Sequence, residues 1–175
     1  MAEVEQIQIG SAFAEFSKVR LPFGLDVEIL RVEGTGLLLQ REPFDWKLGE
    51  PAKVVATVTD LALQAFLEHK KPGGLRDFFV QLSQGEVQVH ATARVLIEIR
   101  AVAVCDLEIV EGKQLFVRLK KVDVLGVGAK SLVQKQLDEI NPILDVKDLP
   151  VPLELQTVEI GDGKIVMTAA LLPKS

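Results

Sequence analysis

The chain has 175 residues, of which 48% are hydrophobic and 26% are charged, and its formal net charge is -5. This length and composition fit one globular domain with a buried core and exclude a disordered chain. The acidic balance argues against a general nucleic-acid binder, because that function needs a basic surface to neutralise phosphates.

The first quarter of the chain is predicted to be mostly extended. Apolar and polar residues alternate loosely there, and Pro22, Gly24 and the glycine-containing stretch 33–36 separate the apolar segments. Strands are expected at 6–16, 19–21, 25–32, 37–39 and 53–57. Residues 43–51, which hold Trp46, predict a loop or an irregular edge.

Three helices are expected, near residues 60–71, 75–83 and 128–140. Thr59 can act as the N-cap of the first helix, and Pro72 followed by two glycines ends it. The second helix places apolar residues at spacings of three and four, namely Leu75, Phe78, Phe79 and Leu82. The third begins at glycines 126 and 128 and ends at Asn141, which precedes a proline.

The strongest pattern is a long alternation in the middle of the chain. Every odd-numbered position from Val87 to Ile109 is apolar, and most even positions are polar. This period predicts strand structure with one apolar face. A straight strand of this length would measure about 75 Å at 3.3 Å per residue, whereas a compact chain of this size is roughly 40 Å across. The segment must therefore bend strongly, contain a bulge, or turn without a turn signature, and the residues leave these three open.

Two hairpins are expected in the second half. Residues 111–113 (Glu-Gly-Lys) form a turn that joins the long alternation to a strand at 114–120. Residues 161–163 (Gly-Asp-Gly) form a tight turn between strands at 153–160 and 164–171. Long antiparallel strands with a few helices between them predict an α+β fold, without the βαβ rhythm of nucleotide-binding folds.

Few residues carry catalytic or metal-binding chemistry. His69 and His90 are far apart and lack metal-ligand spacing, so they are interpreted as a helix-end residue and a solvated strand residue. The single cysteine, Cys105, excludes a disulfide framework and is expected in the core. The glycine pairs at 34–36 and 126–128 are too short to cradle a phosphate. We therefore expect no catalytic residues, no metal and no cofactor.

The first residues of the chain are used to predict its cellular location. Residues 1–10 lack the pattern of a signal peptide, and no window is long enough to span a bilayer. A cytoplasmic protein is expected, or one of the cell envelope if a leader has been removed. The lysine pairs 70–71 and 120–121 are expected to be solvated ends of elements, with a contact to lipid headgroups as the alternative. The residues do not determine the oligomeric state.

Three motifs point to a family. They are Val-Thr-Asp-Leu at 58–61, the Glu-Gly-Lys turn at 111–113, and the run from Ile140 through Asn141-Pro142 and Leu149-Pro150-Val151-Pro152-Leu153 to Ile165. In these motifs the chain from Val54 onward resembles the LmeA-like phospholipid-binding family, a bacterial domain related in architecture to tubular lipid-binding proteins. Within the single domain that length and composition predict, strands at 1–52 precede a core at 53–175 that resembles the family. The resemblance implies a long, strongly curved antiparallel sheet wrapped around two or three helices, with an apolar groove for acyl chains.

Two functional hypotheses follow. The first is non-enzymatic binding or transfer of a phospholipid or fatty-acyl ligand, with peripheral membrane contact left open. Its groove would be lined by Leu63, Phe66, Leu67, Phe78, Phe79, Leu82, Leu132, Val133, Leu137 and Ile140. The alternative is a ligand-free structural or protein-interaction domain with a closed core. Hydrolytic or transferase activity on lipids is a third, weaker hypothesis.

Overall fold

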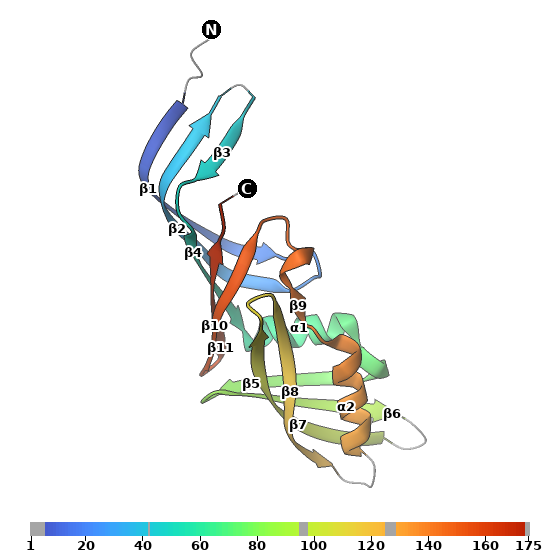
Figure 1. Cartoon of the computed structure of the whole chain (residues 1–175). Coiled ribbons are helices and arrows are strands. Elements are labelled where there is room, and N and C mark those ends of the chain that lie inside the picture. The colour runs from blue at the N-terminus through green and yellow to red at the C-terminus, as the bar shows by residue number, and fades with distance from the viewer. Residues whose placement is uncertain (1–5, 42, 95–97, 125–128, 174–175) are drawn as a thin grey trace.

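The computed structural model describes residues 6–41, 43–94, 98–124 and 129–173 (Figure 1). These residues form antiparallel strands, two α-helices and two short 3-10 helices. The fold is therefore mainly β with few helices. The curved antiparallel character expected from the sequence is confirmed, but the strands are divided between two sheets instead of forming one.

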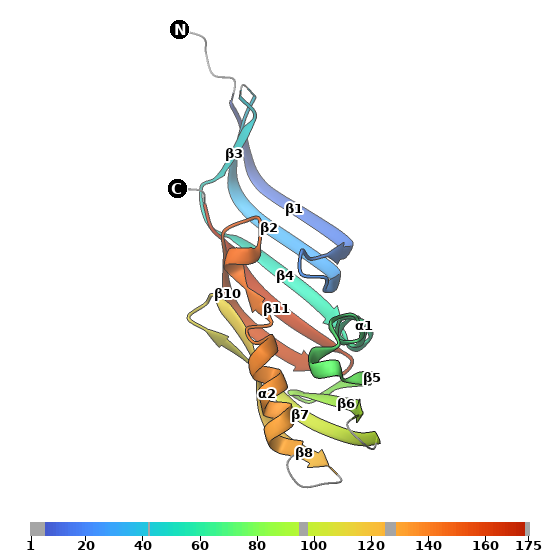
Figure 2. The ribbon, with the colours of Figure 1, turned by 90° about the vertical axis from the view of Figure 1, so that its right-hand side faces the viewer.

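The first sheet, called sheet A, is built from six strands. Its order is β1-β2-β4-β11-β10, and β3 pairs with the part of β2 that β4 does not reach. Figure 2 shows that β1 and β2 bend along their length. The strands are β1 (Gln6–Arg20), β2 (Asp26–Gln40), β3 (Asp45–Leu48), β4 (Ala52–Thr59), β10 (Leu153–Gly161) and β11 (Lys164–Leu171).

Strand β2 continues through residues 33–36, where the sequence predicted a break. The glycines in this stretch let β2 approach the neighbouring chain closely and let the strand bend. A Cβ added to Gly34 would lie 2.9 Å from the Cβ of Ala52, so only glycine lets these strands approach so closely. Gly36 has a positive φ of 65°, which a residue with a side chain rarely adopts. The predicted turn is therefore a bend within one strand.

The second sheet, called sheet B, has the order β5-β6-β7-β8-β9, with every pair antiparallel. In Figure 1 it forms the lower part of the molecule. Its strands are β5 (Arg76–Ser83), β6 (Glu86–Arg94), β7 (Glu98–Val110), β8 (Gln114–Val124) and β9 (Leu144–Asp145).

The long alternation from Val87 to Ile109 forms two strands of a hairpin. Val87 pairs with Cys105 and Arg94 pairs with Glu98, so the chain reverses between Arg94 and Glu98 without a glycine or proline signal. The residues between them, 95–97, lie outside the described part. Odd positions pair with odd positions, so the apolar side chains of both strands share one face.

The helix expected at 75–83 is wrong, because this segment is strand β5. Phe78, Val80 and Leu82 are buried, while Phe79 and Gln81 between them are exposed. The segment fits both the helical and the strand period. Pairing with β6 satisfies its backbone groups and places the alternate side chains in the core.

The other helices agree with the sequence. Helix α1 (Asp60–Lys70) begins at Thr59, whose Oγ1 accepts a hydrogen bond from the backbone N–H of Ala62 at 3.2 Å. It is followed by η1 (Pro72–Gly74). Helix α2 (Ala129–Ile140) is followed by Asn141, and η2 (Val146–Asp148) comes after β9. The expected start at 126–128 lies outside the described residues. No helix in the described ranges has both the length and the apolar character needed to cross a membrane.

Backbone hydrogen bonds between turns join the two sheets. The N–H of Gly85 donates to the carbonyl of Ile160 at 2.9 Å, and the N–H of Gly163 donates to the carbonyl of Leu82 at 3.0 Å. The N–H of Leu155 donates to the carbonyl of Gly112 at 2.7 Å. Buried residues of both sheets pack together behind this junction, for example Leu155 with Leu115. The junction therefore fixes the position of sheet B relative to sheet A.

Asp145 connects three segments beside this junction. Its buried carboxylate accepts hydrogen bonds from Gln114 Nε2 at 2.7 Å and from the backbone N–H of Lys147 at 3.0 Å, and it lies 3.1 Å from Lys147 Nζ. These interactions, the bond from Gln114 first, lower the pKa of Asp145 below its ordinary value of 3.8. The carboxylate therefore stabilises the folded protein when it is ionised.

The substitution Asp145→Asn tests this role. The folded protein binds the Asp145 proton more weakly than the unfolded chain, so the stabilisation is present above the unfolded pKa and is lost as the pH falls below about 4. We expect the variant to melt at a lower temperature than the wild type at pH 7, and the difference to shrink on acidification. Thermal unfolding followed by circular dichroism measures both. A difference that does not change with pH would contradict the ionised role.

Candidate functional site

A cavity of about 330 Å³ lies between sheet B, the two α-helices and the adjoining part of sheet A. Its lining side chains are apolar with one exception, the carboxamide of Gln136 on α2. The volume falls near the lower end of the range of about 300–1,000 Å³ found for small-molecule sites. The cavity therefore suits one slender apolar group better than a large polar molecule.

Sheet B supplies the floor of the cavity from the odd positions of β6 and β7. Lining residues on β6 run from Val87 to Ala93, which is about 20 Å along a strand at 3.3 Å per residue. Ala91 pairs with Ala101, so two small side chains lie opposite each other in the middle of the floor. These alanines leave space that leucine or phenylalanine would fill.

Helix α1 forms part of the cover through Leu63, Phe66 and Leu67. Polar side chains on the same helix fix it against β5, which is the edge strand of sheet B. Glu68 Oε1 accepts a hydrogen bond from the backbone N–H of Phe78 at 2.6 Å, and Gln64 Oε1 accepts one from Val80 at 3.3 Å. The helix therefore satisfies strand donors that would otherwise have no partner in the sheet.

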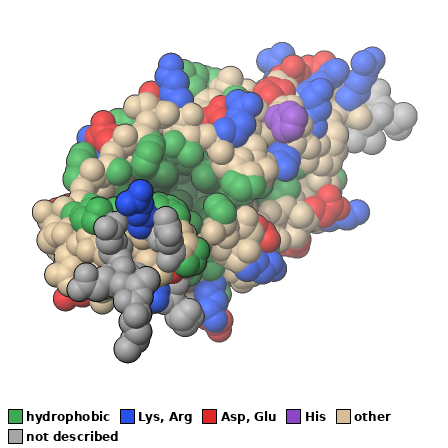
Figure 3. Space-filling model, turned by 90° about the horizontal axis from the view of Figure 1, so that it is seen from above, with side chains coloured by type: hydrophobic (Ala, Val, Ile, Leu, Met, Phe, Trp, Pro, Cys, Tyr) green, Lys and Arg blue, Asp and Glu red, His purple; other side chains and the backbone are tan. Residues whose placement is uncertain are grey.

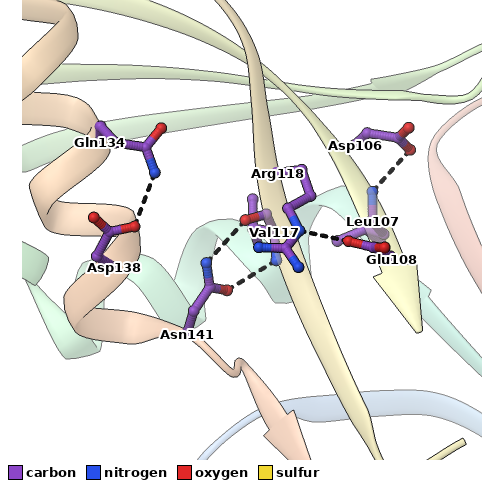
Figure 4. Close-up of polar contacts among 8 residues, drawn as sticks. All are labelled: Asp106, Leu107, Glu108, Val117, Arg118, Gln134, Asp138 and Asn141. Atoms are coloured by element: carbon purple, nitrogen blue, oxygen red, sulfur yellow. Dashed lines mark hydrogen bonds and ion pairs between the residues drawn. The ribbon is translucent and has the colours of Figure 1, made fainter. Parts of the chain in front are cut away.

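Helix α2 covers the other side, and Asn141 holds its end to β8. Asn141 Nδ2 donates to the carbonyl of Val117 at 2.9 Å, and the N–H of Val117 donates to Asn141 Oδ1 at 2.8 Å (Figure 4). Figure 4 also shows the exposed pair Gln134–Asp138 on the same helix, joined at 2.8 Å. The half-buried Asn141 contact is thus a polar link between the end of α2 and the sheet that it covers.

Eight of the ten residues predicted for the groove line this cavity: Leu63, Phe66, Leu67, Phe78, Leu132, Val133, Leu137 and Ile140. The other two do not. Leu82 is buried in the core with Val80 and Cys105, and Phe79 points to the outer face of sheet B, where it is 54% exposed. The position of Phe79 follows from β5 being a strand, because adjacent residues of a strand face opposite sides. Leu82 lies on the same face as Phe78 and Val80 but is not among the lining residues. That the eight bind a ligand stays a prediction.

Sequence reasoning missed the residues of the floor and Gln136. The floor residues Ala91, Ala101 and Ala103 belong to the odd-numbered alternation, which predicted an apolar face but not which part of it stays uncovered. Gln136 lies three residues after Val133 and four before Ile140, so helical spacing places it on the apolar face of α2. Its position on the apolar face of the helix was the sequence signal that could have identified Gln136 as a lining residue.

The single cysteine and the two histidines do not form a reactive site. Cys105 is a buried core residue, as expected, and burial raises the pKa of its thiol to about 11, so it stays protonated near neutral pH. His69 is exposed in the last turn of α1. His90 lies on the outer face of sheet B with its ring centroid 5.5 Å from that of Phe79. Within the described ranges no three His, Cys, Asp or Glu side chains are grouped to hold a metal.

Apolar side chains also gather on sheet A, beyond the cavity. Viewed from above, the surface is hollowed and apolar side chains line the hollow (Figure 3). The strand register places Ile7, Leu39 and Trp46 in one row across β1, β2 and β3. Trp46 packs against the core cluster that includes Val54 and Leu155, so this row lies on the core side of the sheet.

Comparison with known proteins gives one match. Residues 42–170 match the family model described as LmeA-like phospholipid-binding, which is most of the chain. No curated protein and no solved structure matches the chain significantly.

The contact between α2 and β8 is tested by Asn141→Ala. This change leaves the N–H and the carbonyl of Val117 without their side-chain partner, and we expect a loss of about 2 kcal/mol or more in unfolding free energy. Asn141→Asp, which still accepts from Val117 but cannot donate to it, should lose less. Urea unfolding measures the difference.

Gln134→Ala is the matched control on the same helix. It removes an exposed contact and should change the unfolding free energy by less than about 0.5 kcal/mol. Equal effects of the Asn141 and Gln134 substitutions would show that the Asn141 contact does not hold the helix.

Proposed function

Because the chain belongs to the LmeA-like phospholipid-binding family, we propose that it binds one acyl chain of a phospholipid or related lipid in the cavity between sheet B and the two α-helices. The supporting observation is the nearly uniform apolar lining of that cavity. Burial of apolar surface stabilises binding by about 25 cal/mol per Å². An alkyl chain is apolar along its whole length, so all of its buried surface contributes to this stabilisation.

The charged head group of the lipid remains outside the cavity in this proposal. No lining residue carries a charge, and moving an unpaired phosphate or carboxylate into such surroundings is very unfavourable. The floor length of about 20 Å along β6 suits an extended alkyl chain. The small volume favours one chain over two.

Exposed cations beside α1 support a peripheral contact with the lipid head group. Lys70 and Lys71 end this helix, and Lys70 Nζ lies 5.7 Å from the ring centroid of Phe66, which lines the cavity. The lysines at 120 and 121 differ, because each has an acidic partner, Glu86 for Lys120 and Asp123 for Lys121. We therefore assign the head-group contact to the first lysine pair.

The proposed activity is binding or transfer and includes no catalytic step. The family is described by phospholipid binding. The cavity lining offers apolar contact and one amide but no acid and base pair that could cleave an ester. Transfer would require only that the alkyl chain of the lipid enter and leave the cavity.

A second candidate function is association with another protein through strand β1. Strand β1 pairs only with β2, so one edge of this 15-residue strand is free among the described residues. Ile7 and Phe13 on it are 62% and 65% exposed. A long edge with apolar side chains is a template for pairing with another strand.

The lipid proposal is tested by filling the cavity with Ala101→Phe. Lipid should co-purify with the wild type, as detected by native mass spectrometry and solvent extraction. We expect the variant to carry at least about tenfold less, because the larger ring occupies the space above the floor. Ala93→Phe, nearer the end of β6, provides a second position if the first variant is unstable.

Val102→Phe is the matched control, because Val102 neighbours Ala101 on β7 but faces the opposite side of the sheet. It should retain the wild-type amount of lipid. Circular dichroism verifies that each variant is folded. If the wild type carries no lipid and takes none up from phospholipid vesicles, the proposal fails.

The second candidate is tested by light scattering on the wild type and on Phe13→Lys. An edge interaction predicts self-association of the wild type that the added charge weakens. If the wild type stays monomeric at high concentration, self-association through β1 is not a function of this protein.

A further inference from the structure

The cavity reaches the surface at one end of sheet B. At the opposite end its lining residues Val87 and Cys105, which pair across β6 and β7, are 7% and 2% exposed. Further along the same two strands the paired lining residues Ala93 and Ile99 are partly exposed. Leu132, in the first turn of α2, also lines the cavity and is 41% exposed. We call this more exposed end of the cavity the mouth end.

Strands β5, β6 and β7 bring three arginines to the mouth end. Arg94 is the last residue of β6 and pairs with Glu98, the first residue of β7. Arg76, the first residue of β5, and Arg100 on β7 both pair with Thr92. The register therefore places all three arginines at or within two residues of the ends of neighbouring strands.

Helix α1 adds two lysines to the same end. Gln64 and then Glu68 accept hydrogen bonds from successively earlier residues of β5, so the end of the helix lies near the start of that strand. The helix ends at Lys70, and Lys71 follows it. Figures 1 and 2 both show the end of α1, the start of β5, the end of β6 and the start of β7 gathered together.

The unpaired charges at the mouth end are mainly positive. Among the described residues, Arg94, Arg100 and the two lysines that follow one another at the end of α1 take part in no ion pair. Arg76 differs, because its Nε lies 3.7 Å from Asp77 Oδ2. Glu98 is an acidic neighbour without an ion-pair partner in the same part of the chain. This end is therefore positive on a chain whose formal net charge is -5.

We propose that the mouth end is the surface by which the protein docks on a bilayer that contains anionic phospholipids. This inference rests on the proposed function and specifies where the lipid enters. An anionic bilayer attracts clustered lysines and arginines, and each of them contributes to binding. Docking here places the mouth against the bilayer, so an alkyl chain enters the cavity without exposing its apolar surface to water.

The experiment measures binding of the purified protein to vesicles by flotation. Vesicles of equal parts phosphatidylglycerol and phosphatidylcholine supply the anionic surface, and vesicles of phosphatidylcholine alone supply the neutral one. The wild type should bind the anionic vesicles at least about tenfold more tightly than the neutral ones. Raising NaCl to about 0.5 M should remove most of this difference, because salt screens exposed charges.

The double variant Arg94→Glu with Arg100→Glu removes two of the cations and reverses their charge. We expect it to bind the anionic vesicles at least about tenfold more weakly than the wild type. Arg94→Gln with Arg100→Gln removes the charge without reversing it and should weaken binding by a smaller factor. This second variant serves if circular dichroism shows that the first does not fold.

Lys47→Glu with Lys53→Glu is the matched control. Both lysines are exposed on sheet A, in β3 and β4, so this variant undergoes the same change of net charge away from the mouth end. Its binding to the anionic vesicles should stay within about twofold of the wild type, because salt screens charges that lie far from the bilayer. An equal loss in the control and in the arginine variants would overturn the inference.

The remaining outcomes separate docking from lipid binding. If the wild type carries lipid but binds both kinds of vesicle equally, or if the arginine variants bind like the wild type, the inference is overturned and the proposed function stands. If vesicle binding depends on the two arginines but no lipid enters the cavity, docking stands and the proposed function fails. A loss of vesicle binding in the arginine variants, with lipid in the wild-type cavity, supports both.

Discussion

The structure depends on covering the apolar inner faces of two curled sheets. Alternate residues along β6 and β7 put one unbroken apolar face toward the interior, and water must be kept away from it. Among the described residues, two α-helices provide the cover. Small side chains such as Ala91 and Ala101 line the floor beneath them, so the covering helices and the sheet do not close completely. The cavity follows from this mismatch of volumes.

Polar contacts at the margins hold the helices in place. Helix α1 is capped by Thr59 and fixed to the edge of β5 by Glu68, while α2 is attached to β8 through Asn141. Gln64 adds a further hydrogen bond from α1 to β5, and the side chains by which the two helices line the cavity are apolar except Gln136. This division keeps directional bonds outside the cavity and leaves its interior adaptable to an apolar chain, because dispersion and hydrophobic contacts do not specify one arrangement.

Charge and apolar surface are separated around the cavity. Exposed lysines lie at the end of α1, a single neutral amide lies where α2 approaches η1, and the remaining lining is apolar. A phospholipid likewise has a charged head group at one end and apolar alkyl chains at the other. The membership of residues 42–170 in a phospholipid-binding family agrees with this separation.

The sequence alone determined features that depend on neighbouring residues. These include the period of two from Val87 to Ile109, the cap at Thr59, the end of the helix at Asn141 and the turn at 161–163, since backbone preferences act locally. Tertiary structure decided the rest. Residues 76–83 became a strand because β6 satisfied their backbone groups, and the chain reversed after Arg94 because antiparallel pairing and burial outweighed the missing turn signal. The cavity between sheet B and the two helices was decided last, because an unfilled volume depends on side chains brought together from distant parts of the chain.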